Sequence, residues 1–208
     1  MECISTSNGP YEFAAVQLSR GRGALDSEAS KANLLLLQQV FDEREIPFGI
    51  IYGTLLGAVR EGAFIPWDED VDVFLLDEHR SAFFDALHDL RAAGLDLVRS
   101  DGDLYSLMRG DDYIDVYVFR RCGNRRMCNE DTVAARHLEN SDWLSFLGSR
   151  FRVPSSPESF LRSVYGKDWR TPKRDAPARP WSLGKRIREG LKVYFPVLVR
   201  IKRVLNAR

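Results

Sequence analysis

The sequence predicts one α/β (α+β) domain, a small mixed sheet flanked by helices, followed by a basic C-terminal extension. The chain has 208 residues, 44% of them hydrophobic, which is enough for one domain with a buried core. Apolar residues at helical spacing alternate with short stretches of strand-type alternation, and Gly and Pro separate these segments. This composition excludes a disordered, collagen-like or disulfide-rich chain.

The predicted elements follow from local signals. Asp26 is a suitable N-cap for the first helix, and Pro47 stops it. Gly62 and Gly94 end the next two helices. The predicted helices cover residues 26–45, 55–61, 81–93 and 159–165. The predicted strands cover residues 48–52, 68–76, 95–99, 105–109 and 113–120. After an Arg- and Cys-rich turn at 121–128, the chain is expected to be helical or irregular up to Pro154.

Charged residues are unevenly distributed along the chain. Residues 170–208 hold 12 Lys and Arg against 2 Asp and Glu, which leaves 18 basic and 28 acidic residues in 1–169. We therefore expect a polar N-terminal arm (1–25), a core domain (26–172) and a basic amphipathic tail (173–208). The apolar stripe of the tail suits either a helix at an anionic membrane interface or a helix docked on the domain itself. The tail lacks the pattern of a nucleic-acid reader.

Targeting signals are not evident. The N-terminus lacks the charged and apolar regions of a signal peptide, and no apolar run approaches the ~20 residues needed to span a bilayer. The three cysteines form no CxxC pair, which is typical of reduced thiols. We expect a cytoplasmic protein, with the inner face of the cell membrane as a further site if the tail binds lipid.

Three aspartates mark the first candidate site. Asp68, Asp70 and Asp72 alternate along the predicted strand 68–76, so they share one face of it. Like charges at this spacing repel unless a cation neutralises them. Hard carboxylate oxygens suit Mg²⁺ or Mn²⁺.

A later strand, 113–120, supplies a fourth carboxylate. Asp115 shares a face with Tyr113 and Tyr117, and an isolated Asp between apolar neighbours is costly to bury without a partner. A shared metal ion accounts for it.

A glycine turn precedes the second helix. The backbone N–H groups of Gly53 and Thr54, at a helix N-terminus, form a ready anion site. Arg60 lies about two turns further on and can clamp the same anion. Strand, glycine turn, helix and acidic strand together indicate phosphoryl or nucleotidyl transfer.

Each feature alone has a simpler interpretation. The acidic run can be a solvated edge strand, and a Gly-Thr pair before a helix is common. Asp115 can be ion-paired to Arg109 or Arg120. A glycine turn, a spaced Asp pair and a further Asp on a later strand, taken together, rarely arise by chance.

These residues carry a family resemblance. The stretches GTLLGAVR (53–60) and FIPWDEDVD (64–72) resemble the signature of the LicD family, which includes fukutin-type enzymes, and residues 153–172 are similar to its second block. The resemblance implies a nucleotidyltransferase-like fold of the DNA-polymerase-beta type over 26–172. The pattern of that superfamily falls on Gly53-Thr54, then Asp70 and Asp72, then Asp115. Glu61 and Glu69 depart from common family residues.

The resemblance also implies a reaction. LicD-type proteins are thought to transfer a phospho-alcohol, such as phosphocholine, from a CDP-alcohol to a glycan hydroxyl, with release of CMP; fukutin-type relatives use CDP-ribitol. Asp70 and Asp72 are then expected to hold Mg²⁺ or Mn²⁺. Asp115 is expected to complete the metal site or take the acceptor's proton, and Asp68 to be a further ligand or an orienting carboxylate. Gly53, Thr54 and Arg60 are expected to hold phosphate oxygens.

The implied partners are a nucleotide-activated donor and a glycan or lipid-linked glycan acceptor of lipopolysaccharide or cell-wall assembly. Two alternatives stay open. One is a nucleotidyltransferase that moves NMP from an NTP to a small molecule, protein or RNA and releases pyrophosphate. The other is a catalytically silent domain that binds a glycan-assembly partner. The intact set Asp70, Asp72 and Asp115 disfavours the silent domain.

Overall fold

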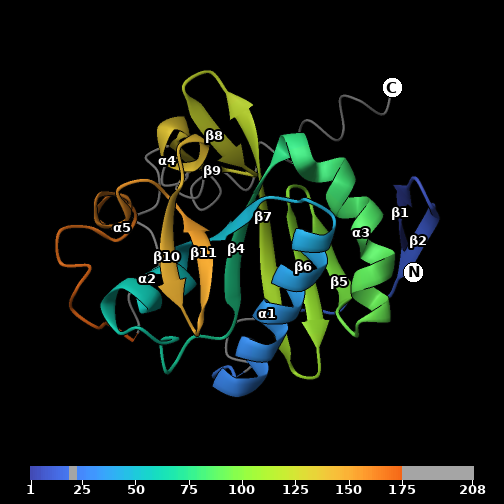
Figure 1. Ribbon diagram of the computed structural model, residues 1–208, viewed down its shortest axis with the longest axis horizontal. Helices are drawn as coiled ribbons and strands as arrows, with labels where there is room; N and C mark the ends of the chain where they lie inside the picture. Colours follow the sequence, from blue (N-terminus) through green and yellow to red (C-terminus); the bar gives the residue numbers. More distant parts are fainter. Residues whose placement is uncertain (19–22, 175–208) are drawn as a thin grey trace, which may run out of the picture.

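A mixed β-sheet runs through the centre of the computed structural model, which describes residues 1–18 and 23–174 (Figure 1). Its strands lie in the order β10-β11-β3-β4-β7-β6-β5. Their bounds are β3 Phe48–Ile50, β4 Val71–Leu76, β5 Asp96–Asp101, β6 Leu104–Arg109, β7 Asp112–Cys122, β10 Asp142–Phe146 and β11 Ser149–Val153. β4 is parallel to β7 and β11 is parallel to β3, whereas the other neighbours along this path are antiparallel. The predicted mixed sheet is therefore confirmed.

Helices lie on both sides of this sheet. α1 (Ser27–Glu43) and α3 (Arg80–Ala92) run side by side over one face, and a 3-10 turn, η1 (Asp77–His79), leads into α3 (Figure 1). The Asp26 side chain caps α1 by accepting from the N–H groups of Glu28 and Ala29, both at 2.9 Å. α2 (Tyr52–Arg60) packs against α5 (Pro157–Tyr165). α4 (Ala135–Glu139) follows the ribbon formed by β8 (Arg125–Cys128) and β9 (Asp131–Ala134).

The hydrophobic core lies beneath α1 and α3. Alternate residues of the two central parallel strands are fully buried, among them Val73 on β4 and Val116 on β7. Because side chains alternate across a strand, the intervening residues Asp72 and Asp115 face the opposite side. The core packing thus fixes which face of the sheet carries the acidic residues.

The predicted polar N-terminal arm (1–25) contains a β-hairpin in its first half. β1 (Glu2–Thr6) and β2 (Gly9–Phe13) form a two-stranded antiparallel sheet beside α3. Tyr11 and Phe13 are buried in the main core. Burial of two aromatic rings outweighs the polar, Gly-containing composition that suggested an arm.

The region after β7 also differs from its prediction. A turn was expected at 121–128 and a helical or irregular stretch from there to Pro154, but this region contains β8 (Arg125–Cys128), β9 (Asp131–Ala134), α4, β10 and β11. These strands have four or five residues each and expose many side chains, so they lack the apolar alternation by which strands are recognised. The predicted helix at 159–165 is confirmed as α5.

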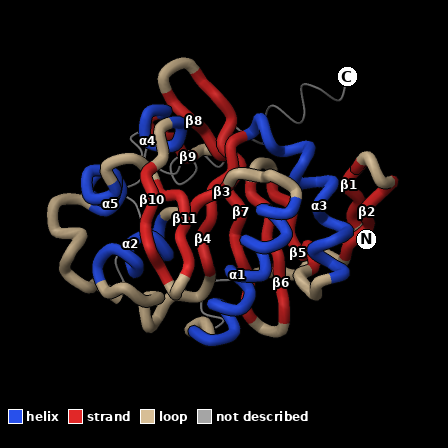
Figure 2. The backbone as a smooth tube through the Cα atoms, in the orientation of Figure 1, coloured by secondary structure: helices blue, strands red, loops and turns tan. Residues whose placement is uncertain are grey.

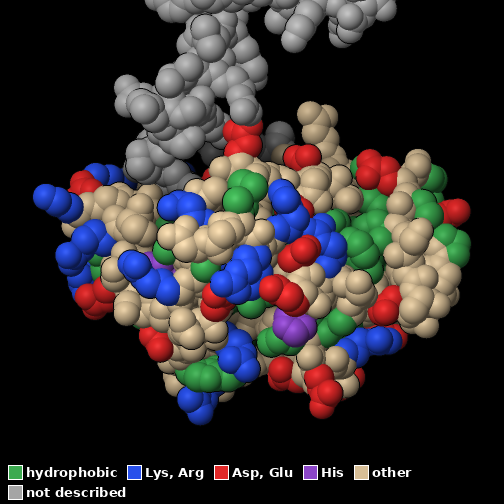
Figure 3. Space-filling view, turned by 90° about the horizontal axis from the view of Figure 1, so that it is seen from above, with side chains coloured by type: hydrophobic (Ala, Val, Ile, Leu, Met, Phe, Trp, Pro, Cys, Tyr) green, Lys and Arg blue, Asp and Glu red, His purple; other side chains and the backbone are tan. Residues whose placement is uncertain are grey.

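The basic tail lies almost wholly outside the described residues, so its amphipathic helix stays a prediction. Among residues 1–18 and 23–174, none of the helices is long and apolar enough to cross a bilayer. On the face shown in Figure 3, Lys and Arg side chains are interspersed with Asp and Glu over the described surface.

Gly49 lies in close contact with the neighbouring strands. It lies on the three-residue strand β3, between β11 and β4 (Figure 2). A Cβ atom here would overlap the carbonyl oxygen of Arg152 and lie 2.5 Å from Cε1 of Phe74. We expect Gly49→Ala to lower the free energy of unfolding by about 1–3 kcal/mol, because the neighbouring backbone must shift. Urea denaturation measures this, and an unchanged midpoint would show that the sheet yields there.

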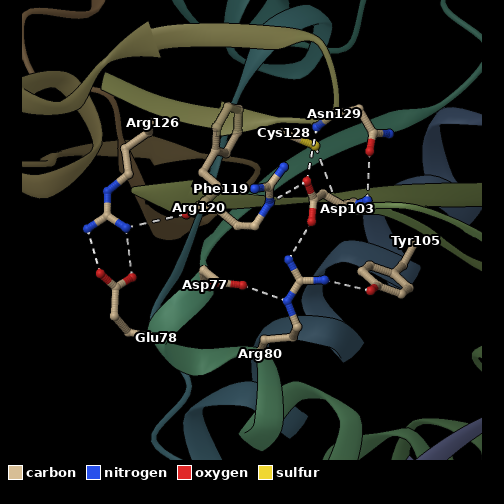
Figure 4. Close-up of polar contacts among 10 residues, drawn as sticks. All are labelled: Asp77, Glu78, Arg80, Asp103, Tyr105, Phe119, Arg120, Arg126, Cys128 and Asn129. Carbon is tan, nitrogen blue, oxygen red and sulfur yellow. Dashed lines mark hydrogen bonds and ion pairs between the residues drawn. The ribbon is translucent and has the colours of Figure 1, made fainter. Parts of the chain in front are cut away.

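A buried carboxylate joins helix α3, strand β7 and the turn between β8 and β9. The Asp103 side chain, in the turn between β5 and β6, accepts from Nη2 of Arg80 at 2.6 Å, Nε of Arg120 at 2.8 Å and the Asn129 N–H at 3.1 Å (Figure 4). Nearby, the nearly buried Arg126 donates two hydrogen bonds to Glu78 and so anchors the β8–β9 ribbon to η1. The ribbon is held to the domain by charge pairs.

We expect Asp103→Asn to lower the free energy of unfolding by about 2–3 kcal/mol near neutral pH. Burial opposes ionisation of the Asp103 carboxyl, but the hydrogen bonds from Arg80, Arg120 and Asn129 outweigh it and lower its pKa. The stabilisation is therefore present above the unfolded pKa of about 4 and is lost as the pH falls through the lower folded pKa.

Urea denaturation at a series of pH values tests this, with the exposed Asp101→Asn as the matched control. The difference between wild type and Asp103→Asn should shrink as the pH is lowered toward ~2. A difference that does not change with pH would mean that the charge of Asp103 contributes nothing.

Candidate active site

A cavity of about 490 Å³ opens on the polar face of the sheet. Six carboxylates line it: Asp68, Glu69, Asp70, Asp72, Asp115 and Asp168. Gly53 and Arg60 of α2 also line it, as do Tyr113 and Tyr117 of β7. The structure therefore brings together six of the seven predicted site residues, and Thr54 is the exception.

Asp68, Asp70 and Asp72 were predicted to lie on one face of a strand, but they do not. β4 begins at Val71, so Asp68 and Asp70 lie in the preceding turn and only Asp72 is on the strand. The Asp68 N–H donates to the carbonyl of Ile65, and its own carbonyl accepts from Leu25. These backbone hydrogen bonds, rather than pairing with another strand, fix the conformation of the turn. The aspartates still meet at one cavity because the turn folds back over the end of β4.

The first turn of α2 holds Asp72 rather than presenting a free anion site. The helix begins at Tyr52, earlier than the predicted Leu55. The Gly53 N–H donates to Oδ2 of Asp72 at 2.7 Å, and the Thr54 hydroxyl accepts from the Asp72 N–H at 2.8 Å. The predicted role of Thr54 in phosphate binding has no support in this geometry, because its side chain is buried and outside the cavity lining.

Gly53 lies directly against the carboxylates. A Cβ atom at this position would overlap Oδ2 of Asp68 and lie 3.0 Å from Oδ2 of Asp72. Only glycine lets the helix N-terminus approach the two side chains this closely. This close approach is the physical reason for a glycine before the acidic run.

The carboxylates strongly influence one another. Burial, followed by the charges of Asp72 and Asp115, raises the pKa of Asp70 well above its usual value. Burial and the charge of Asp70 raise the pKa of Asp68 to about 7. Crowded, desolvated acids of this kind favour the binding of a compensating cation.

The carboxylates supply too few ligands for a metal ion unless a bound ligand adds more. In the part of the chain that the structure describes, no group of three His, Cys, Asp or Glu side chains is arranged to hold a metal ion by itself. Mg²⁺ is usually bound by only one or two carboxylates together with substrate phosphates. Asp70 and Asp72 supply such a pair.

Asp115 is held by partners that the sequence did not reveal. Nη2 of Arg99 donates to both of its carboxylate oxygens, at 2.7 and 2.6 Å, and the Ser106 hydroxyl donates to Oδ1 at 2.6 Å. The sequence suggested Arg109 or Arg120 as ion-pair partners. Arg120 instead pairs with Asp103, and the Arg109 side chain contacts Asn33.

Basic and aromatic groups complete the cavity wall. Arg60 lines the cavity with its side chain only 9% exposed, and its Nε donates to Glu61 at 2.8 Å. Trp67, Tyr165 and Trp169 also line the cavity. Lys173 and Arg174, which the sequence did not single out, add positive charge there.

A family model described as "LicD/FKTN/FKRP, nucleotidyltransferase domain" matches residues 45–156, more than half of the chain. The chain belongs to this family. Gly53, Asp70, Asp72 and Asp115 all fall inside the matched residues of the LicD domain.

Curated relatives of this LicD-family chain are distant. It is 25% identical over 160 residues to the human ribitol-5-phosphate transferase FKTN, covering 70% of this chain and 34% of that protein. It is 42% identical over 41 residues to the lipopolysaccharide cholinephosphotransferase LicD of Haemophilus influenzae, covering 20% of this chain and 16% of that one. The chain therefore spans about a third or less of each of these two proteins.

Solved structures support the fold. The solution structure of the antibiotic-resistance factor ANT(2'')-Ia matches with a TM-score of 0.53 at 14% identity, covering 86% of this chain and 99% of that one. The crystal structure of ANT(2'')-Ia with adenylyl-2''-tobramycin matches with a TM-score of 0.50 at 16% identity, covering 85% and 96%. The predicted nucleotidyltransferase-like fold is confirmed.

Proposed function

We propose that this LicD-family chain is a metal-dependent phosphotransferase. It moves a phospho-alcohol, of the phosphocholine or phosphoalditol kind, from a CDP-activated donor to a hydroxyl of a cell-surface glycan and releases CMP. The observation that carries the proposal is the cavity in which Gly53, Asp70, Asp72 and Asp115 meet, inside the residues that match the family. The transferase activities for which FKTN and LicD are named support the class of reaction.

Asp70 and Asp72 are the residues that hold the Mg²⁺ or Mn²⁺ ion in this proposal, with Asp68 beside them. When bound, the ion neutralises charge on the donor diphosphate. The Gly53 N–H fixes Asp72 through its 2.7 Å hydrogen bond. Arg60 lies in the cavity wall, where its guanidinium can donate to phosphate oxygens once it exchanges part of its bonding with Glu61.

Asp115 is the group that takes the acceptor's proton. Of its two expected roles, this one agrees better with the geometry, because the Arg99 guanidinium and the Ser106 hydroxyl already compensate this carboxylate and the cation is bound by Asp70 and Asp72. Oδ2 accepts one hydrogen bond, from Arg99, and keeps a lone pair for the acceptor hydroxyl. The acceptor oxygen forms a bond to the distal phosphorus, and the bond from that phosphorus to the CMP oxygen breaks. CMP leaves with the electron pair, and the hydroxyl proton passes to Asp115.

The acceptor is proposed to be a glycan or lipid-linked glycan, with the basic tail as a peripheral membrane contact. The polar cavity, which carries both carboxylates and arginines beside aromatic rings, suits a hydroxyl-rich acceptor and a charged donor.

The nucleotide product tests this proposal. The protein is incubated with Mg²⁺, a cell-surface glycan preparation and CDP-choline or CDP-ribitol, and parallel reactions contain CTP or ATP. We expect CMP from a CDP-alcohol, dependent on both glycan and Mg²⁺. Release of pyrophosphate from an NTP would instead indicate nucleotidyl transfer, and no product with any nucleotide would favour a silent binding domain.

A further inference from the structure

A row of polar side chains crosses four strands of the sheet. Arg99 on β5 is the cross-strand partner of Ser106 on β6, which pairs with Asp115 on β7, which pairs with Asp72 on β4. Nε of Arg99 donates to the Ser106 hydroxyl at 2.8 Å, so Arg99, Ser106 and Asp115 form a closed triangle of hydrogen bonds. Ser106 is fully buried and Asp115 is 4% exposed.

A break in strand register places Arg99 in this row. Leu97 pairs with Leu107, but the next paired residue is Arg99, opposite Ser106, so Val98 is an extra residue on β5. The Val98 carbonyl accepts instead from the Val16 N–H at 2.8 Å. A bulge redirects the side chains that follow it, and here it turns Arg99 from the opposite face toward the cavity that Asp115 lines.

We propose that Arg99 and Ser106 are positioning residues. They hold the Asp115 carboxylate away from Asp70 and Asp72, the two carboxylates that bind the cation. This inference rests on the proposed function, because it assumes that a divalent cation binds at that pair. Neither Arg99 nor Ser106 reacts in this account. Both act through Asp115.

The physical consequence is ordered loading of the cation. An Asp115 carboxylate free to turn inward would add a further negative charge and would favour binding of Mg²⁺ or Mn²⁺ without the donor. With Asp115 held by a guanidinium, it does not join Asp70 and Asp72, and the phosphate oxygens of the donor must supply the other ligands. The triangle thus makes cation binding depend on the donor and keeps Asp115 available for the acceptor hydroxyl.

Mn²⁺ affinity, measured by electron paramagnetic resonance on the full chain without nucleotide, tests this inference. We expect Arg99→Met to bind Mn²⁺ on the order of tenfold more tightly than wild type, because a cation beside the carboxylates is removed and Asp115 is released. Ser106→Ala should change affinity in the same direction by less. It alters no charge, so it also serves if Arg99→Met does not fold. Arg109→Met, which removes a positive charge outside the cavity lining, should match wild type.

Adding CDP gives a second readout. CDP should tighten Mn²⁺ binding in wild type by a larger factor than in Arg99→Met, because Asp115 is already available to the ion in the variant. A role of Arg99 in fold stability alone would leave both the Mn²⁺ affinity and this factor unchanged in the folded protein.

The outcomes separate this inference from the proposed function. If Asp70→Asn abolishes Mn²⁺ binding, but folded Arg99→Met and Ser106→Ala bind Mn²⁺ no more tightly than wild type, this inference is wrong and the proposed cation site is supported. If Asp70→Asn binds Mn²⁺ as tightly as wild type, or if wild type binds no Mn²⁺ with or without CDP, the proposed cation site is wrong and so is this inference.

Discussion

Asp70→Asn is expected to reduce CMP release by about 10³-fold or more, because a bound metal ion contributes several kcal/mol of charge stabilisation and each ~1.4 kcal/mol is a factor of ten in rate. The fold should be retained and at least as stable as in wild type near neutral pH. Burial and the charges of Asp72 and Asp115 raise the pKa of Asp70, so its ionised form opposes folding and a neutral amide removes that penalty.

Turnover and urea denaturation, measured on the same preparation, check this result. Asp111→Asn, an exposed position in the β6–β7 turn outside the cavity lining, is the matched control and should keep both wild-type turnover and wild-type stability. Turnover that is retained in Asp70→Asn would show that Asp70 does not bind the cation. A large loss of stability would show that Asp70 supports the fold.

Gly53→Ala is expected to lower kcat by about 10²-fold, because a displacement of catalytic groups by about 1 Å has an effect of this size. The new Cβ would overlap Oδ2 of Asp68 and crowd Oδ2 of Asp72. Both obstacles are the ends of side chains, which can move without disturbing the backbone. The change in unfolding free energy should therefore stay within about 1 kcal/mol.

Gly57→Ala, on the same helix, is the matched comparison and should behave in the opposite way. Its Cβ would overlap the carbonyl oxygen of Ala63 and lie 3.1 Å from the Ile65 nitrogen. Because these are backbone atoms, the substitution should lower stability and leave kcat of the folded fraction near that of wild type. Equal kcat for Gly53→Ala and wild type would show that the carboxylates tolerate displacement.

Local sequence signals predicted much of the fold. Asp26 caps α1 as predicted, and the alternation around Asp115 correctly placed Tyr113 and Tyr117 on its face, toward the cavity. These features depend on a few neighbouring residues, so they can be recognised in one sequence. The strands from β8 to β11 depend on pairing partners elsewhere in the chain, and their short, polar sequences carry no equivalent signal.

The candidate site was predictable in its residues and less so in its geometry. The spacing of Asp70 and Asp72 suggested one strand face, but the strand begins only where it meets β7 at Val71. The partner of Asp115 depended on register. Without the extra residue Val98, regular alternation would turn Arg99 to the opposite face. A single sequence does not reveal that bulge, so Arg109 and Arg120 were the more obvious candidates.

Thermal unfolding with CDP-choline, CDP-ribitol and CTP, each with and without Mg²⁺, tests most directly whether this cavity binds a CDP-activated donor through a metal ion. A ligand at about 100 times its dissociation constant adds ~2.7 kcal/mol of stability, or roughly 5–10 °C in Tm for a chain of this size. The account predicts that one CDP-alcohol gives this shift only with Mg²⁺, and that Asp70→Asn abolishes it. A shift with CTP alone, a shift independent of Mg²⁺, or none with any nucleotide would contradict it.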